Sequence, residues 1–227
     1  LRENKVMSLK TRFGNLGNIL DFENLTKENI YVLDSPVLTN SQLKKFKTMF
    51  SKKIKVIDCT FDTKNTLRNR IEEIREEAEI AVRGGANHLI LSDQNISEER
   101  AIVPMILAVG AIHSYLVKLS LRGYASLNAQ TAEAMDTHSF AVLIGVGATT
   151  VNPYLAIDSI FQRYEKKLFG ELDFASCVER FKKSINAGLL KIMSKMGISV
   201  LSSYRGGCNF EAVGLSRGLV ADYFPGM

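Results

Sequence analysis

The most informative stretch for the fold class is Arg83-Gly-Gly-Ala-Asn-His-Leu-Ile-Leu-Ser-Asp93. It joins a predicted helix to a predicted strand through Gly84-Gly85, a pair that favours the end of a helix. The strand over 88–93 is hydrophobic and ends in polar residues. The helix before it is predicted over 66–83 from apolar residues on one face: Leu67, Ile71, Ile74, Ala78 and Ala81. A helix followed directly by a buried strand is the repeating unit of an α/β protein.

The same alternation continues along the chain. Periodicity predicts further strands over 54–58, 124–129, 148–153 and 197–203. It predicts helices over 41–50, 97–123, 136–143, 154–165 and 174–195, and a short one starting over 210–213. Successive βα units predict parallel strands with right-handed crossovers, hence an α/β fold with a mostly parallel sheet. Five strands fit either an open sheet or most of a barrel, and the pattern does not separate the two.

The first fifty residues are expected to be irregular and to pack on the core formed by residues 51–227. Two Gly-Asn pairs over 13–20 favour turns, as does the Asp-Ser-Pro run that begins at Asp34. The chain starts without an initiator Met or a signal-peptide pattern, and it stops on turn residues over 223–227. We therefore expect it to be one domain cut from a longer chain.

Composition excludes several classes of protein. Apolar residues make up 46% and charged residues 23%, as in an ordinary globular domain. The longest apolar run, 101–119, is broken by Pro104 and Lys118, so no membrane segment is predicted. The net charge of +5 comes from scattered basic residues without interleaved aromatics, so nucleic-acid binding is not expected. Three distant cysteines indicate reduced thiols in the cytoplasm and no cysteine-ligated metal or cluster within the chain.

The nucleotide, metal and nucleophile motifs are incomplete. Gly145-Val-Gly147 precedes a strand, whereas a dinucleotide fingerprint follows one, so we interpret it as a helix stop. There is no P-loop and no GxSxG elbow. His88, His113 and His138 form no metal-ligand spacing. Cys208 follows two glycines but has no histidine nearby in sequence, which favours a structural thiol.

Two groups of basic residues near the C-terminal end are interpreted first as structural. Lys191 and Lys195 lie one turn apart near a predicted helix end, where cations complement the helix dipole. An anion is the minority interpretation there. Arg205, in the run over 202–207, follows a predicted strand and could bind an anion with backbone amides. An alternative function is therefore a small ligand-binding domain or enzyme that uses the strand ends near Asp93, Asn152 and Arg205.

Several runs together resemble the central domain of the glutamate synthase large chain. The resemblance covers the whole chain in order, and the run Gly188-Leu-Leu-Lys-Ile-Met-Ser-Lys-Met-Gly-Ile-Ser199 is its most specific part. The other runs lie at 9–20, 35–38, 58–62, 89–93, 106–113, 151–156, 203–206 and 210–215. The resemblance implies an incomplete barrel of the FMN-binding TIM-barrel type. It also implies that residues 51–227 are the body of that domain.

In this family an amidotransferase domain removes ammonia from glutamine, and a flavin domain reduces the imine formed from 2-oxoglutarate. The resemblance implies that the central domain connects the two and helps to enclose the ammonia route. FMN and a 3Fe-4S cluster then belong to the parent enzyme, an oxidoreductase of glutamate biosynthesis, and not to this fragment. The implied partners are the amidotransferase and FMN domains, and a small reductase subunit acting through the parent.

The chain departs from the family pattern at Gln130-Thr131, where Glu-Thr is usual, and at His138-Ser139, where two histidines are usual. These changes remove a charged or paired-imidazole cluster from the end of the third strand. We accordingly predict no catalytic, cofactor-binding or metal-ligating residue in the chain, and expect the isolated fragment to be inactive.

Overall fold

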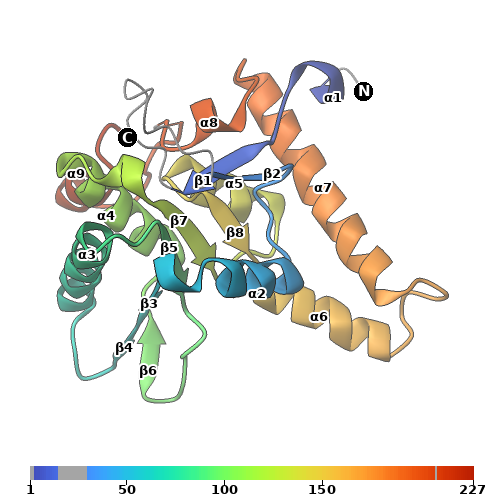
Figure 1. Ribbon diagram of the computed structural model, residues 1–227, viewed down its shortest axis with the longest axis horizontal. Helices are drawn as coiled ribbons and strands as arrows, with labels where there is room; N and C mark the ends of the chain where they lie inside the picture. Colours follow the sequence, from blue (N-terminus) through green and yellow to red (C-terminus); the bar gives the residue numbers. More distant parts are fainter. Residues whose placement is uncertain (1–2, 15–29, 208) are drawn as a thin grey trace.

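The computed structural model describes residues 3–14, 30–207 and 209–227, and its central feature is a parallel sheet (Figure 1). The sheet has the order β3-β5-β7-β8, with β3 at Ile54–Asp58, β5 at His88–Ser92, β7 at Ser126–Gln130 and β8 at Thr150–Asn152. All three pairings are parallel, with Ile54 opposite His88, His88 opposite Ser126, and Asn128 opposite Thr150. A helix precedes each of the last three strands, so the chain alternates as the sequence predicts.

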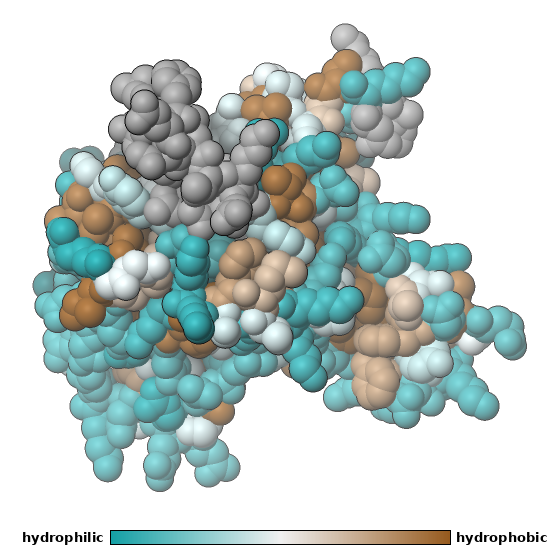
Figure 2. Space-filling view, in the orientation of Figure 1, coloured by the Kyte–Doolittle hydropathy of each residue, from teal (hydrophilic) through white to brown (hydrophobic). Residues whose placement is uncertain are grey.

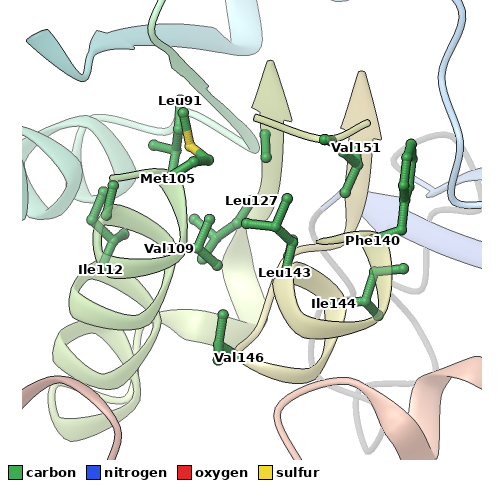
Figure 3. Packing of buried hydrophobic residues seen from close by; sticks show 14 of the residues in the cluster. Leu91, Met105, Val109, Ile112, Leu127, Phe140, Leu143, Ile144, Val146 and Val151 are labelled. Atoms are coloured by element: carbon green, nitrogen blue, oxygen red, sulfur yellow. The ribbon is translucent and has the colours of Figure 1, made fainter. Parts of the chain in front are cut away.

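Three of the helices cover one face of the sheet. They are α3 at Leu67–Arg83, α4 at Met105–Lys118 and α5 at Thr137–Gly145. The central strands present apolar residues on this face, with Leu89, Leu91 and Leu127 all 0% exposed. They meet Met105, Val109 and Leu143 from α4 and α5 in the main core (Figure 3). Because both sides of the contact lack polar atoms, burial of this layer supplies most of the driving force for the fold.

The opposite face is covered by α2 at Asn40–Met49. Leu43 and Phe46 of this helix pack with Ile90 of β5 and with Leu38 in a second, smaller cluster. The rings of Phe46 and Phe50 lie 4.7 and 4.8 Å from the imidazole of His88. Thr39 and Gln42 form a reciprocal capping box that fixes where α2 begins. In a closed barrel this face of the strands would be the interior, and here the chain fills it with its own helix.

The sheet stays open because the N-terminal segment occupies its β8 edge. Val37 pairs in parallel with Val151, and the amide of Leu38 donates to the carbonyl of Val151 at 2.9 Å. The described residues therefore form no closed barrel, which confirms the expected α/β class with an incomplete barrel. The remaining strands form two antiparallel pairs, β1 at Thr11–Gly14 with β2 at Ile30–Leu33, and β4 at Thr60–Asp62 with β6 at Arg100–Ile102.

A long helical hairpin extends away from the sheet (Figure 1). It consists of α6 at Tyr154–Glu165 and α7 at Phe174–Lys195, where the sequence predicts both helices. The short helices α1 at Glu3–Val6, α8 at Leu201–Tyr204 and α9 at Arg217–Tyr223 complete the described fold, with 3-10 turns at Ser51–Lys53 and Arg122–Tyr124.

Three element predictions are wrong. The predicted fifth strand over 197–203 is a single bridge between Val200 and Ser8, followed by helix α8, because burial of Leu201 and Tyr204 follows a helical spacing. The predicted helix over 97–123 begins only at Met105, since Pro104 stands at its start and 100–102 pair as β6. Residues 210–213 form no helix.

Within the first fifty residues, α2 confirms the helix predicted over 41–50, whereas β1 and β2 were not predicted. The turn predicted over 13–20 lies largely outside the described residues, as does Cys208.

Candidate functional site

The carboxyl edge of the sheet is where a parallel α/β fold places its ligands. Asp93, just beyond β5, is 1% exposed. Its carboxylate accepts from the Thr131 hydroxyl at 2.5 Å and from the Ala132 amide at 3.0 Å. Burial, and then the nearby Asp93 carboxylate, raises the pKa of Tyr154. Both oxygens of the Asp93 carboxylate thus accept from donors of the chain itself.

At the end of β3 the carboxylate of Asp58 is likewise bonded to residues of the chain. The Asp58 carboxylate pairs with Arg100 at 3.0 Å and accepts from Asn95 and from the Thr60 amide and hydroxyl. These hydrogen bonds outweigh partial burial and hold the pKa of Asp58 below its usual value. Cys59 is 0% exposed, and burial raises the pKa of its thiol, so it is not a reactive nucleophile.

Amide side chains, of Gln130 and Asn152, lie at the ends of β7 and β8. The ammonium of Lys47 on α2 donates to Gln130 Oε1 at 3.0 Å, and burial lowers the pKa of this lysine. Asn152 Nδ2 donates to the Leu38 carbonyl and to Asn40 Oδ1, both at 2.9 Å. Asn152 Oδ1 is buried and has no partner in the described structure. Gln130 therefore serves to anchor α2.

A row of polar side chains on the sheet face beneath α2 is joined by hydrogen bonds among its own members. Thr150 donates to Asn128 Oδ1 at 2.7 Å, Asn128 donates to Ser126 Oγ at 2.9 Å, and Ser126 Oγ lies 2.9 Å from His88 Nδ1. A flavin phosphate would need cationic side chains or free backbone amides at this edge. The two cations at this edge are already bonded, Lys47 to Gln130 and Arg100 to Asp58, and α2 covers the adjoining face of the sheet. These residues do not fit a flavin phosphate.

Thr131→Val is expected to lower the free energy of unfolding by about 2 kcal/mol, because it removes the hydroxyl that donates to the buried Asp93 carboxylate. Urea denaturation of the purified chain measures the change. The matched control is Thr63→Val, since Thr63 is exposed and its substitution should change stability by less than about 0.5 kcal/mol. Equal effects of the two substitutions would contradict the assigned role of Asp93.

The alternative site at Asp93, Asn152 and Arg205 is not assembled. Arg205 lies instead beside Arg122 and His113, and it lowers the pKa of both by charge repulsion. Arg122 donates to the carbonyls of Ala125 and Gly147, which precede β7 and β8. Arg205 is therefore at the amino edge of the sheet. The prediction was wrong because it rested on a fifth strand that the structure does not contain.

The amino-edge cluster is a packing unit held by Arg122. The Nε of Arg122 donates to His113 Nδ1 at 3.1 Å, and Gly147 and Gly206 lie against the imidazole. Burial, with repulsion from Arg122 and Arg205, lowers the pKa of His113 to about 4. Burial lowers the pKa of Arg122 to about 9. His113 thus accepts from Arg122 only while it is neutral.

Acid is expected to weaken the fold through His113. Its pKa is about 4 when folded and 6.5 for an unperturbed histidine, so its stabilisation is complete above pH 6.5 and is lost as the pH falls toward 4. We expect a loss on the order of 2 kcal/mol from this residue between pH 7.5 and 4. His113→Gln should flatten the pH profile of urea denaturation. Superimposable profiles for the wild type and His113→Gln would contradict this assignment.

The other residues singled out from the sequence have structural places. Gly147 has φ +125°, which confirms the helix stop ahead of β8. Asp136 caps α5 by accepting from the Ser139 amide and hydroxyl at 2.8 and 2.7 Å, so Ser139 belongs to a helix cap. Lys191 and Lys195 are exposed on the last turns of α7, and His138 is exposed on α5. The described residues contain no group of three or more His, Cys, Asp or Glu that could hold a metal ion.

Two buried features escaped the sequence interpretation. One is Arg75 on α3, whose side chain is 6% exposed and pairs with Asp222 at 3.1 Å. The other is the pairing of Thr131 with Asp93. Neither has a local motif, because the partners are brought together only by the tertiary fold. The one sequence feature that could have indicated a buried role for Arg75 is its position, as a charged residue, on the apolar face of the helix predicted over 66–83.

The fold and the closed strand ends define a parallel α/β domain with an incomplete barrel. Comparison with known families then places it: residues 1–216 match the glutamate synthase central domain, and the chain belongs to that family. It is 54% identical, over all of its length, to the glutamate synthase [NADPH] large chain of Azospirillum brasilense. It is 38% identical, again over its whole length, to the chloroplastic ferredoxin-dependent glutamate synthase of Spinacia oleracea. The chain spans 15% of each of these two relatives.

Among solved structures, the flavin-binding domain of baker's yeast flavocytochrome b2 is similar over 89% of this chain and 46% of that one. The TM-score is 0.47 and the sequence identity is 14%. Values this low support no closer comparison. No helix in the described part of the chain has the length and apolar character needed to cross a bilayer.

Proposed function

We propose that the chain is a non-catalytic linking domain of glutamate synthase. It connects the amidotransferase and FMN domains of the same large chain and helps to enclose the route of ammonia between them. The parent enzyme converts glutamine, 2-oxoglutarate and a reductant into two glutamates. The observation that carries the proposal is the closed carboxyl edge, where Asp58 and Asp93 are saturated by donors of the chain and α2 covers the sheet face.

The cofactors are assigned to the rest of the parent enzyme. FMN and a 3Fe-4S cluster belong to segments outside these residues, in line with the poor fit of a flavin phosphate at the described edge. Relatives named for NADPH and for ferredoxin both match the full length of the chain. We therefore place the choice of electron donor, and any small reductase subunit, outside this domain. The free thiols of Cys59 and Cys177 suit a reducing compartment, the cytoplasm.

The division of the chain remains part of the proposal. Residues 51–227 form the body of the domain and residues 1–50 pack on it. The contacts of 36–38 with β8 and of α2 with β5 support this division. Removal of residues 1–50 is accordingly a change to the core and not the loss of a dispensable extension.

The proposal is tested by mixing the purified 227-residue chain with glutamine, 2-oxoglutarate, a reductant and FMN. We expect no glutamate formation and no flavin co-eluting with the protein in gel filtration. Stoichiometric flavin retained on the protein, or turnover above the rate without protein, would overturn the non-catalytic assignment. A circular dichroism spectrum of the same sample verifies that the chain is folded.

A further inference from the structure

The α6–α7 hairpin and the start of α2 together line an open groove. The groove has a volume of about 530 Å³. Its floor is apolar and comprises Ile157 and Phe161 of α6 with Phe174, Ala175 and Val178 of α7. Phe161 is 46% exposed, and its ring lies 5.3 Å from that of Phe174 in an edge-to-face arrangement. An aromatic pair with one ring half open to solvent is a ready anchor for an apolar side chain.

The rim of the groove is acidic. Asp158 and Glu179 line it, and the lining includes no lysine or arginine. Figure 2 shows apolar residues interspersed over this hairpin, whereas the surface over α3 is mostly hydrophilic. The groove therefore combines an apolar floor with negative charge at its edge, a pairing that selects an apolar residue flanked by cations.

We propose that this groove docks a segment of the same large chain from outside residues 1–227, bearing an apolar side chain next to Lys or Arg. The inference rests on the proposed linking function and names the surface that performs it. The chain is 15% of the length of the relatives it matches, so most of the parent polypeptide is available to fill the groove. The hairpin extends from the body of the domain, so a segment seated there contacts the domain without disturbing the sheet.

Site-specific photo-crosslinking in the full-length large chain tests the docking. Phe161 is replaced by p-benzoylphenylalanine, the sample is irradiated, and cross-linked peptides are identified by mass spectrometry. We expect one dominant intramolecular product that joins position 161 to a peptide outside these 227 residues with a basic residue near the cross-linked site. The matched control places the same photoprobe at Glu76, on the charged, exposed face of α3, and should give at least tenfold less of any such product.

Charge reversal supplies the second arm. Glu179→Lys, combined with the probe at 161, should reduce the yield of the product at least threefold, whereas Glu76→Lys should not change it. Products confined to this domain, or a yield no greater than that at position 76, would overturn the docking surface. Cross-links to a second copy or to another subunit would overturn the assigned occupant, and an unchanged yield with Glu179→Lys would overturn the charge-based recognition. None of these results bears on flavin binding or turnover, which test the proposed function separately.

Discussion

Gly147→Ala is expected to lower the free energy of unfolding by about 4 kcal/mol, the sum of backbone strain and overpacking. Gly147 has φ +125°, a conformation that residues with a side chain rarely adopt. A Cβ built there would lie 2.4 Å from Cγ of His113. The imidazole has little room to move, since Arg122 bonds one side and Gly206 packs against it. Urea denaturation of the purified chain measures the loss.

Gly123→Ala is the matched control for this effect. Nothing lies within 4 Å of a Cβ built at Gly123, so the substitution should change stability by less than about 1 kcal/mol. A loss at Gly147 of less than about 1 kcal/mol would mean that the amino-edge cluster is far looser than described.

Arg75→Met should cost about 3 kcal/mol, because Arg75 joins α3 to the C-terminal helix α9 through a buried charge. Its guanidinium pairs with Asp222 at 3.1 Å and lies 4.7 Å from the ring centroid of Tyr223. It also donates to the Ala111 carbonyl of α4 at 3.3 Å. Methionine replaces only the apolar stem of the arginine and loses the ion pair, the cation–π contact and the hydrogen bonds. Thermal or urea denaturation gives the magnitude, and limited proteolysis should show earlier cleavage near α9.

Arg83→Met is the control for this substitution. Arg83 is on the same helix and pairs with Glu79 at 2.8 Å, but its side chain is 57% exposed. An exposed pair of this kind contributes between about 0 and 1 kcal/mol. If both substitutions had the same small effect, Arg75 would not hold α9 in place.

The sequence predicts the elements whose periodicity is long and uninterrupted. Helices α6 and α7 lie where their apolar spacing and caps place them, and β3 has the predicted bounds. The prediction fails where local preference and burial disagree. The run that begins at Ile198 is rich in β-branched residues, yet Leu201 and Tyr204 point into the core with helical spacing. Pro104 shortened α4 because its missing amide marks a helix start and not an interior position.

The sequence itself contains none of the complete catalytic motifs considered above. The hydrogen bonds and ion pairs that engage Asp58 and Asp93 at the strand ends could not be predicted from it. Asp93 appeared only as a polar residue after a strand, and its donors, Thr131 and Ala132, come from the next βα unit. Nothing local specifies that α2 covers the sheet face, since this depends on Leu43 and Phe46 meeting Ile90. Contacts between residues far apart in sequence decide both features.

The stoichiometry of the full-length enzyme shows whether this domain links two active domains without chemistry of its own. The measurement is the ratio of glutamine hydrolysed to 2-oxoglutarate converted, in the wild type and in Glu179→Lys, whose docking groove is impaired, at a temperature where both are folded. A linking domain that encloses the ammonia route predicts a ratio near one for the wild type. For the variant it predicts a clearly higher ratio, with flavin content and ammonia-dependent glutamate formation retained. A variant that loses flavin or ammonia-dependent synthesis while its ratio stays at the wild-type value would contradict the account.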